Sequence, residues 1–198
     1  MLVEEGEQHA SFLVSRTSLP VPLTVSIVHA ACTREERRVL WSALLRDKPL
    51  HGPWLMGGDF NVVMDAGEKK GGQPFHLSEA LDLQEFLSSA ELFDAGFASS
   101  SFPWCNHRFG LARIWKRVDR LLLNHACYDA GLVVSVTHFA RDPSDHSPLL
   151  LSVSSRADGK PRPFRFINAW TSHSGFKDVI KVSWQQECSG SPFQIVCT

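Results

Sequence analysis

The chain has 198 residues, of which 43% are hydrophobic and 21% are charged, and this composition excludes general disorder. The 20 basic and 21 acidic residues leave a net charge of −1, which excludes binding of nucleic acid through bulk positive charge. No apolar run is long enough to span a membrane and the acidic start has no signal-peptide pattern, so we expect an intracellular, non-secreted protein.

The first half of the chain carries clear signals for a strand and a helix. Residues 23–30 alternate between apolar and polar types and predict a half-buried strand. Thr33, followed three residues later by a glutamate, forms a capping box and predicts an amphipathic helix over residues 34–46. A short buried strand is expected at residues 54–56, whereas the acidic residues 1–7 show no strand pattern.

The second half predicts a further helix and several strands. Ser78 is expected to cap a helix that ends near Ala90. Strand-like runs follow at residues 113–123, 132–139 and 147–154. Strand, helix, strand and helix followed by several strands predict an α/β layered domain.

The composition changes after residue 154, so we expect this domain to cover residues 1–154. Residues 155–163 are polar, contain prolines and predict a linker. The remaining segment, residues 164–198, begins with an amphipathic pattern and is expected to be poorly ordered at its end.

Three polar clusters stand at the ends of apolar strands. In the first, Asp59 and Asn61 are two residues apart and should project together, while Phe60 enters the core. Taken alone, this cluster also fits an ordinary turn.

The second and third clusters are equally open when each is taken alone. Trp115, Arg117 and Asp119 would share one face of a strand, which also fits a solvated strand with a cross-strand ion pair. Asp145 and His146 precede an apolar strand, and Asp next to His at such a place is often only a turn.

Taken together, the clusters contain the parts needed to cleave a phosphodiester bond with Mg²⁺. Carboxylates bind a hard cation, and Mn²⁺ is an alternative. A histidine held by a second carboxylate can act as a general base or contact the phosphate, and an asparagine amide can orient the attacking water.

In this order, the clusters resemble the endonuclease/exonuclease/phosphatase superfamily. Four stretches look most like the endonuclease domain of plant LINE-type (non-LTR) retrotransposons, namely Pro53–Val63, Glu68–Gly72, Phe102–Asn106 and Arg117–Asn124. Residues 160–166 with Trp170 resemble the connection toward a reverse transcriptase in those polyproteins. Over residues 12–153, the resemblance implies a DNase-like, two-sheet α/β sandwich.

The resemblance also implies a role for each site residue. Asp59 would position or deprotonate the attacking water, and Asn61 would help to orient it. His146 would contact the scissile phosphate, with Asp119 orienting its imidazole. Asp145 would lie near the metal.

DNA is the expected partner, and neither a membrane nor a small-molecule cofactor is expected. Residues expected near the nucleic acid are Asn106, Arg113, Trp115, Lys116 and Arg117. The family's tyrosine after the strand at residues 23–30 is replaced by His29, which could still contact phosphate.

The family's principal metal site uses an Asn and a Glu from strands upstream of the stretch that matches residues 12–30. The resemblance therefore implies that these N-terminal strands are missing, that Mg²⁺ binds weakly and that DNA nicking is impaired. Three functions stay open: a DNA-nicking endonuclease, nuclear if functional; a non-enzymatic retroelement remnant that binds nucleic acid weakly; and a phosphatase of the same superfamily.

Overall fold

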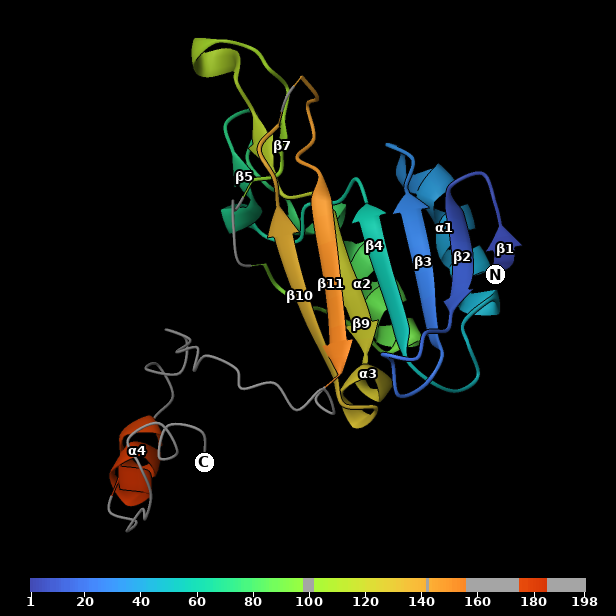
Figure 1. The fold of residues 1–198 in the computed structure, drawn as a ribbon. Helices are drawn as coiled ribbons and strands as arrows, with labels where there is room; N and C mark the ends of the chain where they lie inside the picture. The colour runs from blue at the N-terminus through green and yellow to red at the C-terminus, as the bar shows by residue number, and fades with distance from the viewer. Residues whose placement is uncertain (98–101, 142, 156–174, 185–198) are drawn as a thin grey trace. The chain divides into compact units, whose positions relative to one another are not determined.

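A computed structural model describes residues 1–97, 102–141, 143–155 and 175–184 (Figure 1). The chain divides into two units, Met1–Asp158 and Gly159–Thr198. The described part of the second unit contains helix α4 (Phe176–Trp184). The predicted linker lies outside the described residues apart from Ser155, as does the segment after it apart from residues 175–184. None of the described helices combines the length and the apolar character that crossing a membrane requires.

A six-stranded sheet forms the centre of the first unit. Its strands in spatial order are β1 (Leu2–Glu5), β2 (His9–Val14), β3 (Leu23–His29), β4 (Trp54–Asp59), β9 (Asp119–Asn124) and β6 (Leu92–Asp94). Strands β3 and β4 run parallel, and the other neighbours run antiparallel. The parallel pair requires a crossover, which the helix between the two strands supplies.

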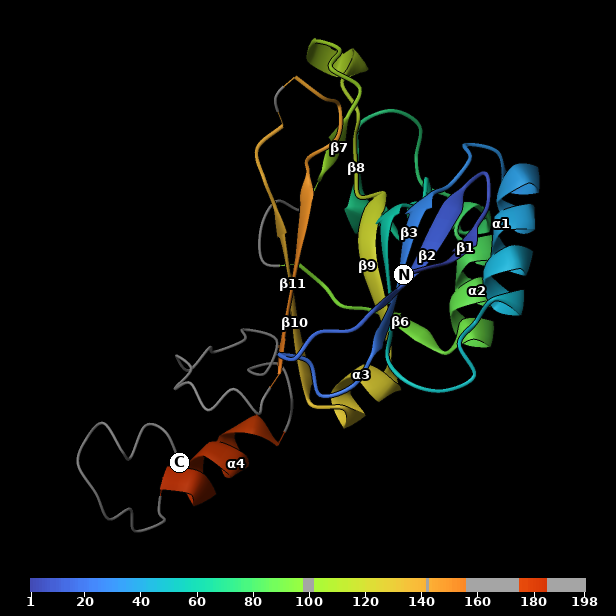
Figure 2. The same cartoon turned by 45° about the vertical axis from the view of Figure 1, so that its right-hand side comes forward.

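Helices α1 (Arg34–Arg46) and α2 (Leu81–Ala90) cover one face of this sheet (Figure 2). Thr33 is confirmed as the N-cap of α1, because its hydroxyl accepts a hydrogen bond from the backbone of Glu36, while the Glu36 carboxylate accepts from the Thr33 hydroxyl instead of the backbone N–H that a capping box uses. Trp41 of α1 stacks on Phe86 of α2, with ring centroids 4.8 Å apart. The helices and the sheet thus share one apolar core.

A second sheet, β10 (Leu132–His138) with β11 (Leu149–Ser155), covers part of the opposite face. Successive side chains of β4 point to opposite faces of the sheet, so this strand packs both against the helices and against the second sheet. Met56 packs in the helical core, whereas Leu55 packs with residues of β10 and β11 and with the short helix α3 (His125–Asp129). The expected two-sheet α/β sandwich is therefore confirmed.

A third, smaller sheet lies beyond the end of the main sheet that carries Asp59 of β4 and Asp119 of β9. It joins β5 (Lys69–Lys70), β8 (Trp115–Lys116) and β7 (Trp104–Cys105) in that order. Short 3-10 turns lie before β5, before α2 and between β7 and β8, at Ala66–Glu68, Leu77–Glu79 and Gly110–Ala112. The two β7–β8 strands form a hairpin that projects beyond the main sheet (Figure 1).

Three sequence-based expectations are wrong. Residues 1–7 do enter a strand, because the bulged β1 pairs with β2. Ser78 does not cap α2, since it lies inside a 3-10 turn that begins after His76 and leads into the helix at Leu81. In the first case hydrogen bonding to β2 overrides the local residue pattern, and in the second the hydrogen bonds of the 3-10 turn do so.

The run at residues 113–123 is also not one strand. β8 belongs to the small sheet and β9 to the six-stranded sheet, and the chain changes sheets at Arg117 and Val118. Strand alternation therefore does not relate Trp115 to Asp119. Phe60, by contrast, is fully buried as expected.

A buried ion-pair network stabilises this change of sheet. The Arg117 guanidinium contacts Glu68 at 2.8 Å and Asp94 at 2.8 Å. Arg120, which is 2% exposed, donates to the same two carboxylates. Burial alone would raise the pKa of Glu68, but hydrogen bonds and charge from Arg120 outweigh burial and lower it. The network joins β6, β9 and the turn before β5 into one unit.

We predict that Glu68→Ala lowers the free energy of unfolding by about 3 kcal/mol, because the two buried guanidinium groups lose a shared carboxylate. Urea denaturation measures the change. Glu85→Ala, at an exposed position of α2, serves as the control and should change stability by less than about 0.5 kcal/mol. Equal stability of the two variants would show that the network does not stabilise the fold.

Candidate active site

The antiparallel pairing of β4 and β9 brings two carboxylates together at one end of these two interior strands. Asp59 is the last residue of β4, Asp119 is the first residue of β9, and the two are direct register partners. Both are almost completely buried. His146 reaches the same place from the segment that precedes β11. Asp59 and His146, which are 87 positions apart in sequence, thus lie together with Asp119 at this end of the sheet. These three residues are called the rim below.

The imidazole of His146 lies between the two carboxylates. Its Nδ1 is 3.0 Å from each carboxylate oxygen of Asp119, so the expected hydrogen bond is present. Its Nε2 is 3.8 Å from Oδ2 of Asp59. One ring nitrogen is therefore held by Asp119, and the other faces Asp59 at the rim.

Burial and charge shift the pKa of two of these groups. The hydrogen bond that the imidazole donates to Asp119 raises the pKa of His146, and the negative charges of Asp119, Asp59 and Asp145 add to the effect. Burial raises the pKa of Asp59, and the like charge of Asp119 acts in the same direction. The site therefore favours a protonated imidazole beside a carboxylate that is more basic than usual.

Asn61 follows the strand in a left-handed conformation, with φ 51°. Its backbone N–H donates to Oδ1 of Asp59 at 2.8 Å, and its side-chain amide donates to the carbonyl of Ala30 at 2.7 Å. Asn61 thus fixes the Asp59 carboxylate. His29, the register partner of Asp59, is exposed beside it, and its positive charge would lower the pKa of Asp59.

Asp145 lies outside the group of three. Its side chain is exposed, and its carboxylate accepts a hydrogen bond of 3.1 Å from the indole of Trp104. The backbone of β7 also binds this segment, since Cys105 N–H donates to the Asp145 carbonyl and Trp104 bridges to His146. Trp104 is therefore a positioning residue that the sequence analysis did not single out. A local sequence pattern does not predict such a contact, because the two segments are about 40 residues apart.

The β7–β8 hairpin, whose base contacts the segment of His146, carries an exposed tip that projects away from the main sheet. Asn106 holds the hairpin closed, because its side-chain oxygen accepts from Ile114 and its amide donates to the Ala112 carbonyl. Phe109 and Leu111 at the tip are 85% and 102% exposed. Asn106 thus organises the hairpin, while large apolar side chains face solvent.

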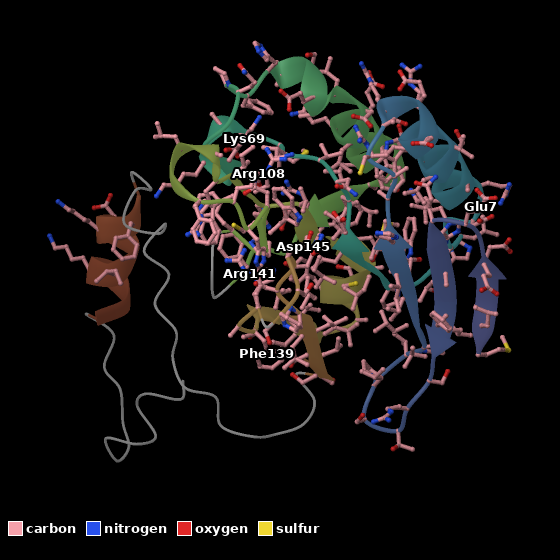
Figure 3. The ribbon with its side chains drawn as sticks, turned by 90° about the horizontal axis from the view of Figure 1, so that it is seen from above. Glu7, Lys69, Arg108, Phe139, Arg141 and Asp145 are labelled. Atoms are coloured by element: carbon pink, nitrogen blue, oxygen red, sulfur yellow. The ribbon has the colours of Figure 1, made fainter. Side chains whose placement is uncertain are left out.

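Cationic and aromatic side chains alternate along the same hairpin. The Arg113 guanidinium lies 5.8 Å from the ring centroid of Trp115, and that of Arg141 lies 4.5 Å from the same ring. Lys116 lies over Trp104 at 5.3 Å. Figure 3 shows Lys69, Arg108 and Arg141 on the same side of the molecule as Asp145, with Glu7 on the other side.

Arg117 differs from the other expected nucleic-acid contacts. Its guanidinium is buried between Glu68 and Asp94, and it also lies 4.7 Å from the ring centroid of Phe97. The structure therefore places Arg117 in the scaffold of the hairpin and leaves Arg113 and Lys116 nearer its surface.

The donor set at the rim fits a divalent cation. Asp59, Asp119 and His146 each offer a ligand atom, and these atoms lie within 4.8 Å of one another. Two carboxylates suit Mg²⁺, and the imidazole is acceptable to Mn²⁺. Since Asp119 already accepts a hydrogen bond from His146, few oxygens remain for an ion, which would keep several waters.

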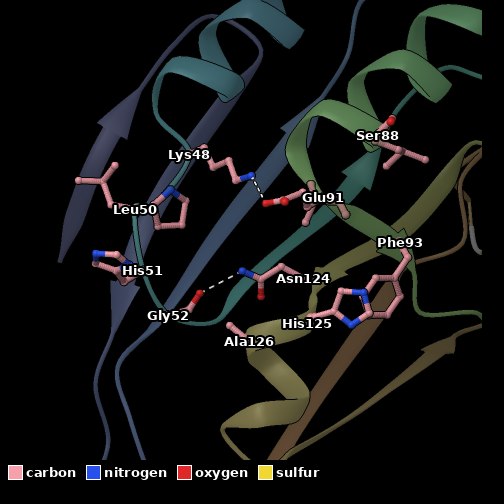
Figure 4. A pocket seen from close by; sticks show the side chains of 13 residues that line it. Lys48, Leu50, His51, Gly52, Ser88, Glu91, Phe93, Asn124, His125 and Ala126 are labelled. Atoms are coloured by element: carbon pink, nitrogen blue, oxygen red, sulfur yellow. Dashed lines mark hydrogen bonds and ion pairs between the residues drawn. The ribbon is translucent and has the colours of Figure 1, made fainter.

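A larger cavity, of about 690 Å³, lies at the other end of β4 and β9 (Figure 4). Its walls include the ion pair of Lys48 with Glu91 and the bond of Asn124 to Gly52. None of the residues of the rim lines it. Cavity volume therefore does not locate the candidate active site. The candidate site is located by the two carboxylates and the imidazole that meet at the opposite end of the strands.

Three solved structures have similar folds. The endonuclease domain of TRAS1, a telomere-specific non-LTR retrotransposon, is 15% identical with a TM-score of 0.53, and the match covers 75% of this chain and 64% of that one. A 3'-5' exonuclease (NExo) from Neisseria meningitidis is 19% identical with a TM-score of 0.53, covering 74% and 65%. The 3' phosphatase NExo from Neisseria, bound to a product DNA hairpin, is 17% identical with a TM-score of 0.54, covering 73% and 64%.

At these identities the likeness establishes the fold. The chain spans slightly less than two thirds of the length of these three solved chains. A comparison with curated proteins gave no match. The model of the endonuclease/exonuclease/phosphatase family matches residues 7–146, which include Asp59, Asp119 and His146. The chain therefore belongs to the endonuclease/exonuclease/phosphatase family.

Proposed function

We propose that the rim hydrolyses phosphodiester bonds of DNA as a metal-dependent endonuclease of the retroelement type, with Mg²⁺ held weakly. The observation that carries this proposal is the placement of the His146 imidazole between Asp119 and Asp59. One carboxylate orients the imidazole, and the other stands free to act on a nucleophile. This arrangement supplies both a proton donor and a proton acceptor at one rim.

Each side chain has a distinct task in this proposal. Asp59, whose pKa is raised by burial, takes a proton from the attacking water. His146, kept protonated by Asp119, donates a hydrogen bond to the phosphate and stabilises its developing charge. Asn61 fixes the carboxylate of Asp59 through its backbone N–H.

A bound divalent cation would stabilise negative charge on the phosphate oxygens. Asp59 and Asp119 would hold it, and Asp145 would approach only if it released the indole of Trp104. Two carboxylates are few for a hard cation, so weak affinity and impaired activity are expected.

The hairpin supports DNA over a small phosphomonoester as the substrate. Exposed Phe109 and Leu111 with Arg108 and Arg113 form an apolar and cationic surface beside the rim, of the kind that contacts bases and backbone phosphates. A phosphatase remains the second candidate, because one solved relative is a 3' phosphatase bound to a DNA hairpin. Release of inorganic phosphate from a 3'-phosphorylated oligonucleotide without nicking would identify it.

We predict that nicking of supercoiled plasmid stays near background at about 5 mM Mg²⁺ and rises as Mg²⁺ or Mn²⁺ is increased further, because the site offers few protein oxygens. Asp59→Ala and His146→Ala should each abolish this metal-dependent nicking. Gel analysis of plasmid relaxation measures it.

Asp129→Ala and His51→Ala are matched controls at exposed positions away from the rim and should leave nicking unchanged. If no metal concentration produced nicking that depends on Asp59, the chain would not be an endonuclease, and the phosphatase and the non-enzymatic remnant would be left. Full activity at micromolar Mg²⁺ would instead contradict weak metal binding.

We predict that His146 in the metal-free protein titrates above the ordinary histidine pKa of about 6.5. Asp119→Asn should lower the pKa of His146, because the amide carries no negative charge. The pair stabilises the fold below that ordinary value, and this contribution is lost as the pH rises through the raised pKa of His146.

The pKa of His146 is measured from the NMR shift of its Cε1 proton against pH. Asp129→Asn, a charge change at an exposed residue of α3, is the control and should leave the titration in place. An unchanged titration in Asp119→Asn would contradict the role of Asp119.

We predict that Arg113→Ala weakens binding of duplex DNA and lowers the slope of log affinity against log salt by about 1, the value for one phosphate contact. Fluorescence anisotropy in the uncleaving His146→Ala background measures it. Arg38→Ala, at an exposed position of α1, should change neither quantity. Equal slopes for the two variants would exclude the hairpin from the DNA interface.

A further inference from the structure

A cavity of about 410 Å³ opens beside the catalytic rim. It lies where the start of α1, the turn before α2, β8 and the segment after β4 come together. The residues that line it are Cys32, Arg34, Arg37, Asn61, Val62, Val63, Ser78, Glu79 and Lys116. The function proposed above leaves this cavity without a role.

The cavity wall is cationic. It contains Arg34, Arg37 and Lys116 against one carboxylate, Glu79, which accepts a hydrogen bond from the His76 backbone. Arg37 is held rigidly, because Asp82 and the carbonyl of Cys32 bind its guanidinium. With Arg37 balanced by Asp82, the remaining positive charge comes from Arg34 and Lys116.

Arg34 has a donor that the fold does not use. Its Nε is buried and, within the described residues, has no hydrogen-bond partner. A buried donor without a partner costs about 1–3 kcal/mol, and no carboxylate of the described residues forms an ion pair with the Arg34 guanidinium, which lines the cavity with its charge uncompensated. The two glutamates in the first turn of α1 offset the helix dipole, so attraction for an anion rests on these side chains.

Asn61 connects this cavity to the catalytic centre. It lines the cavity, and its backbone N–H donates to the carboxylate of Asp59. A group bound here would therefore lie beside the residue that fixes Asp59, the proposed base for the attacking water.

We propose that this cavity binds a second backbone phosphate of the DNA strand, next to the phosphate that is cleaved, with Arg34 and Lys116 as its ligands. The proposal rests on the proposed function and deepens it. A site that holds two successive phosphates selects a polynucleotide over an isolated phosphomonoester, and it fixes the register of the strand on the rim.

Cys32 is a natural reporter, because it is an exposed free thiol in the wall of the cavity, whereas Cys105 and Cys127 are buried. The experiment uses the full chain with His146→Ala, which prevents cleavage, and with Cys188→Ser and Cys197→Ser. The rate of alkylation by iodoacetamide, a neutral reagent, is followed by mass spectrometry at constant ionic strength. One arm adds inorganic phosphate, and the other adds duplex DNA.

Both ligands should slow alkylation of Cys32, by about tenfold when the ligand is present at about ten times its Kd. DNA should act at a far lower concentration than phosphate, because several contacts then bind together. Arg34→Gln should remove the protection by phosphate. Arg38→Gln, an exposed arginine on another face of α1, should keep it.

Alkylation that neither ligand slows in the protein with Arg34 intact would overturn the proposal, as would equal protection in Arg34→Gln. Protection by phosphate without any by DNA would assign the cavity to a free phosphate instead of a backbone phosphate, and would also overturn it. Because no step requires cleavage, these results are independent of nicking. Protection without nicking would leave the subsite and reject the endonuclease.

Discussion

The pairing of β4 with β9 is the constraint on which the site depends. It sets Asp59 and Asp119 directly opposite each other at a buried edge, where two like charges repel. Two interactions offset this repulsion: the His146 imidazole lies between the two carboxylates, and the Asn61 backbone N–H donates a hydrogen bond to Asp59. The raised pKa of Asp59 and of His146 are two results of the same crowding. The proton donor and the proton acceptor that we propose for this rim thus owe their placement to strand register.

The surrounding scaffold serves to bring the third partner into position. The small sheet continues from β7 onto the segment of Asp145 and His146 through a backbone bridge and the indole of Trp104. The network of Glu68 and Asp94 with two arginines anchors the base of the same hairpin. The hairpin that we propose for DNA contact is therefore joined at its base, through Trp104, to the segment of His146.

The family comprises nucleases and phosphatases, and the groups at the rim do not by themselves distinguish the two, because each acts on a phosphate. What separates them is the surface around the rim. An exposed apolar and cationic hairpin on one side and a cationic cavity on the other fit an extended, polyanionic strand better than a small ester. The weak metal binding that we propose would be the same for either substrate, since it depends on the two carboxylates.

The sequence by itself determined the helix at Arg34–Arg46, the strand at Leu23–His29 and the membership of Asp59, Asp119 and His146 in one site. Local capping and alternation carry the first two, and the order of short motifs carries the third. Only the tertiary structure decided that Arg117 is buried, that Trp104 holds Asp145, that residues 2–5 form a strand, and that Arg34 faces a cavity. Each of these depends on residues between 5 and 82 positions away, and a local pattern contains no information about which distant group will satisfy a charge or a hydrogen bond.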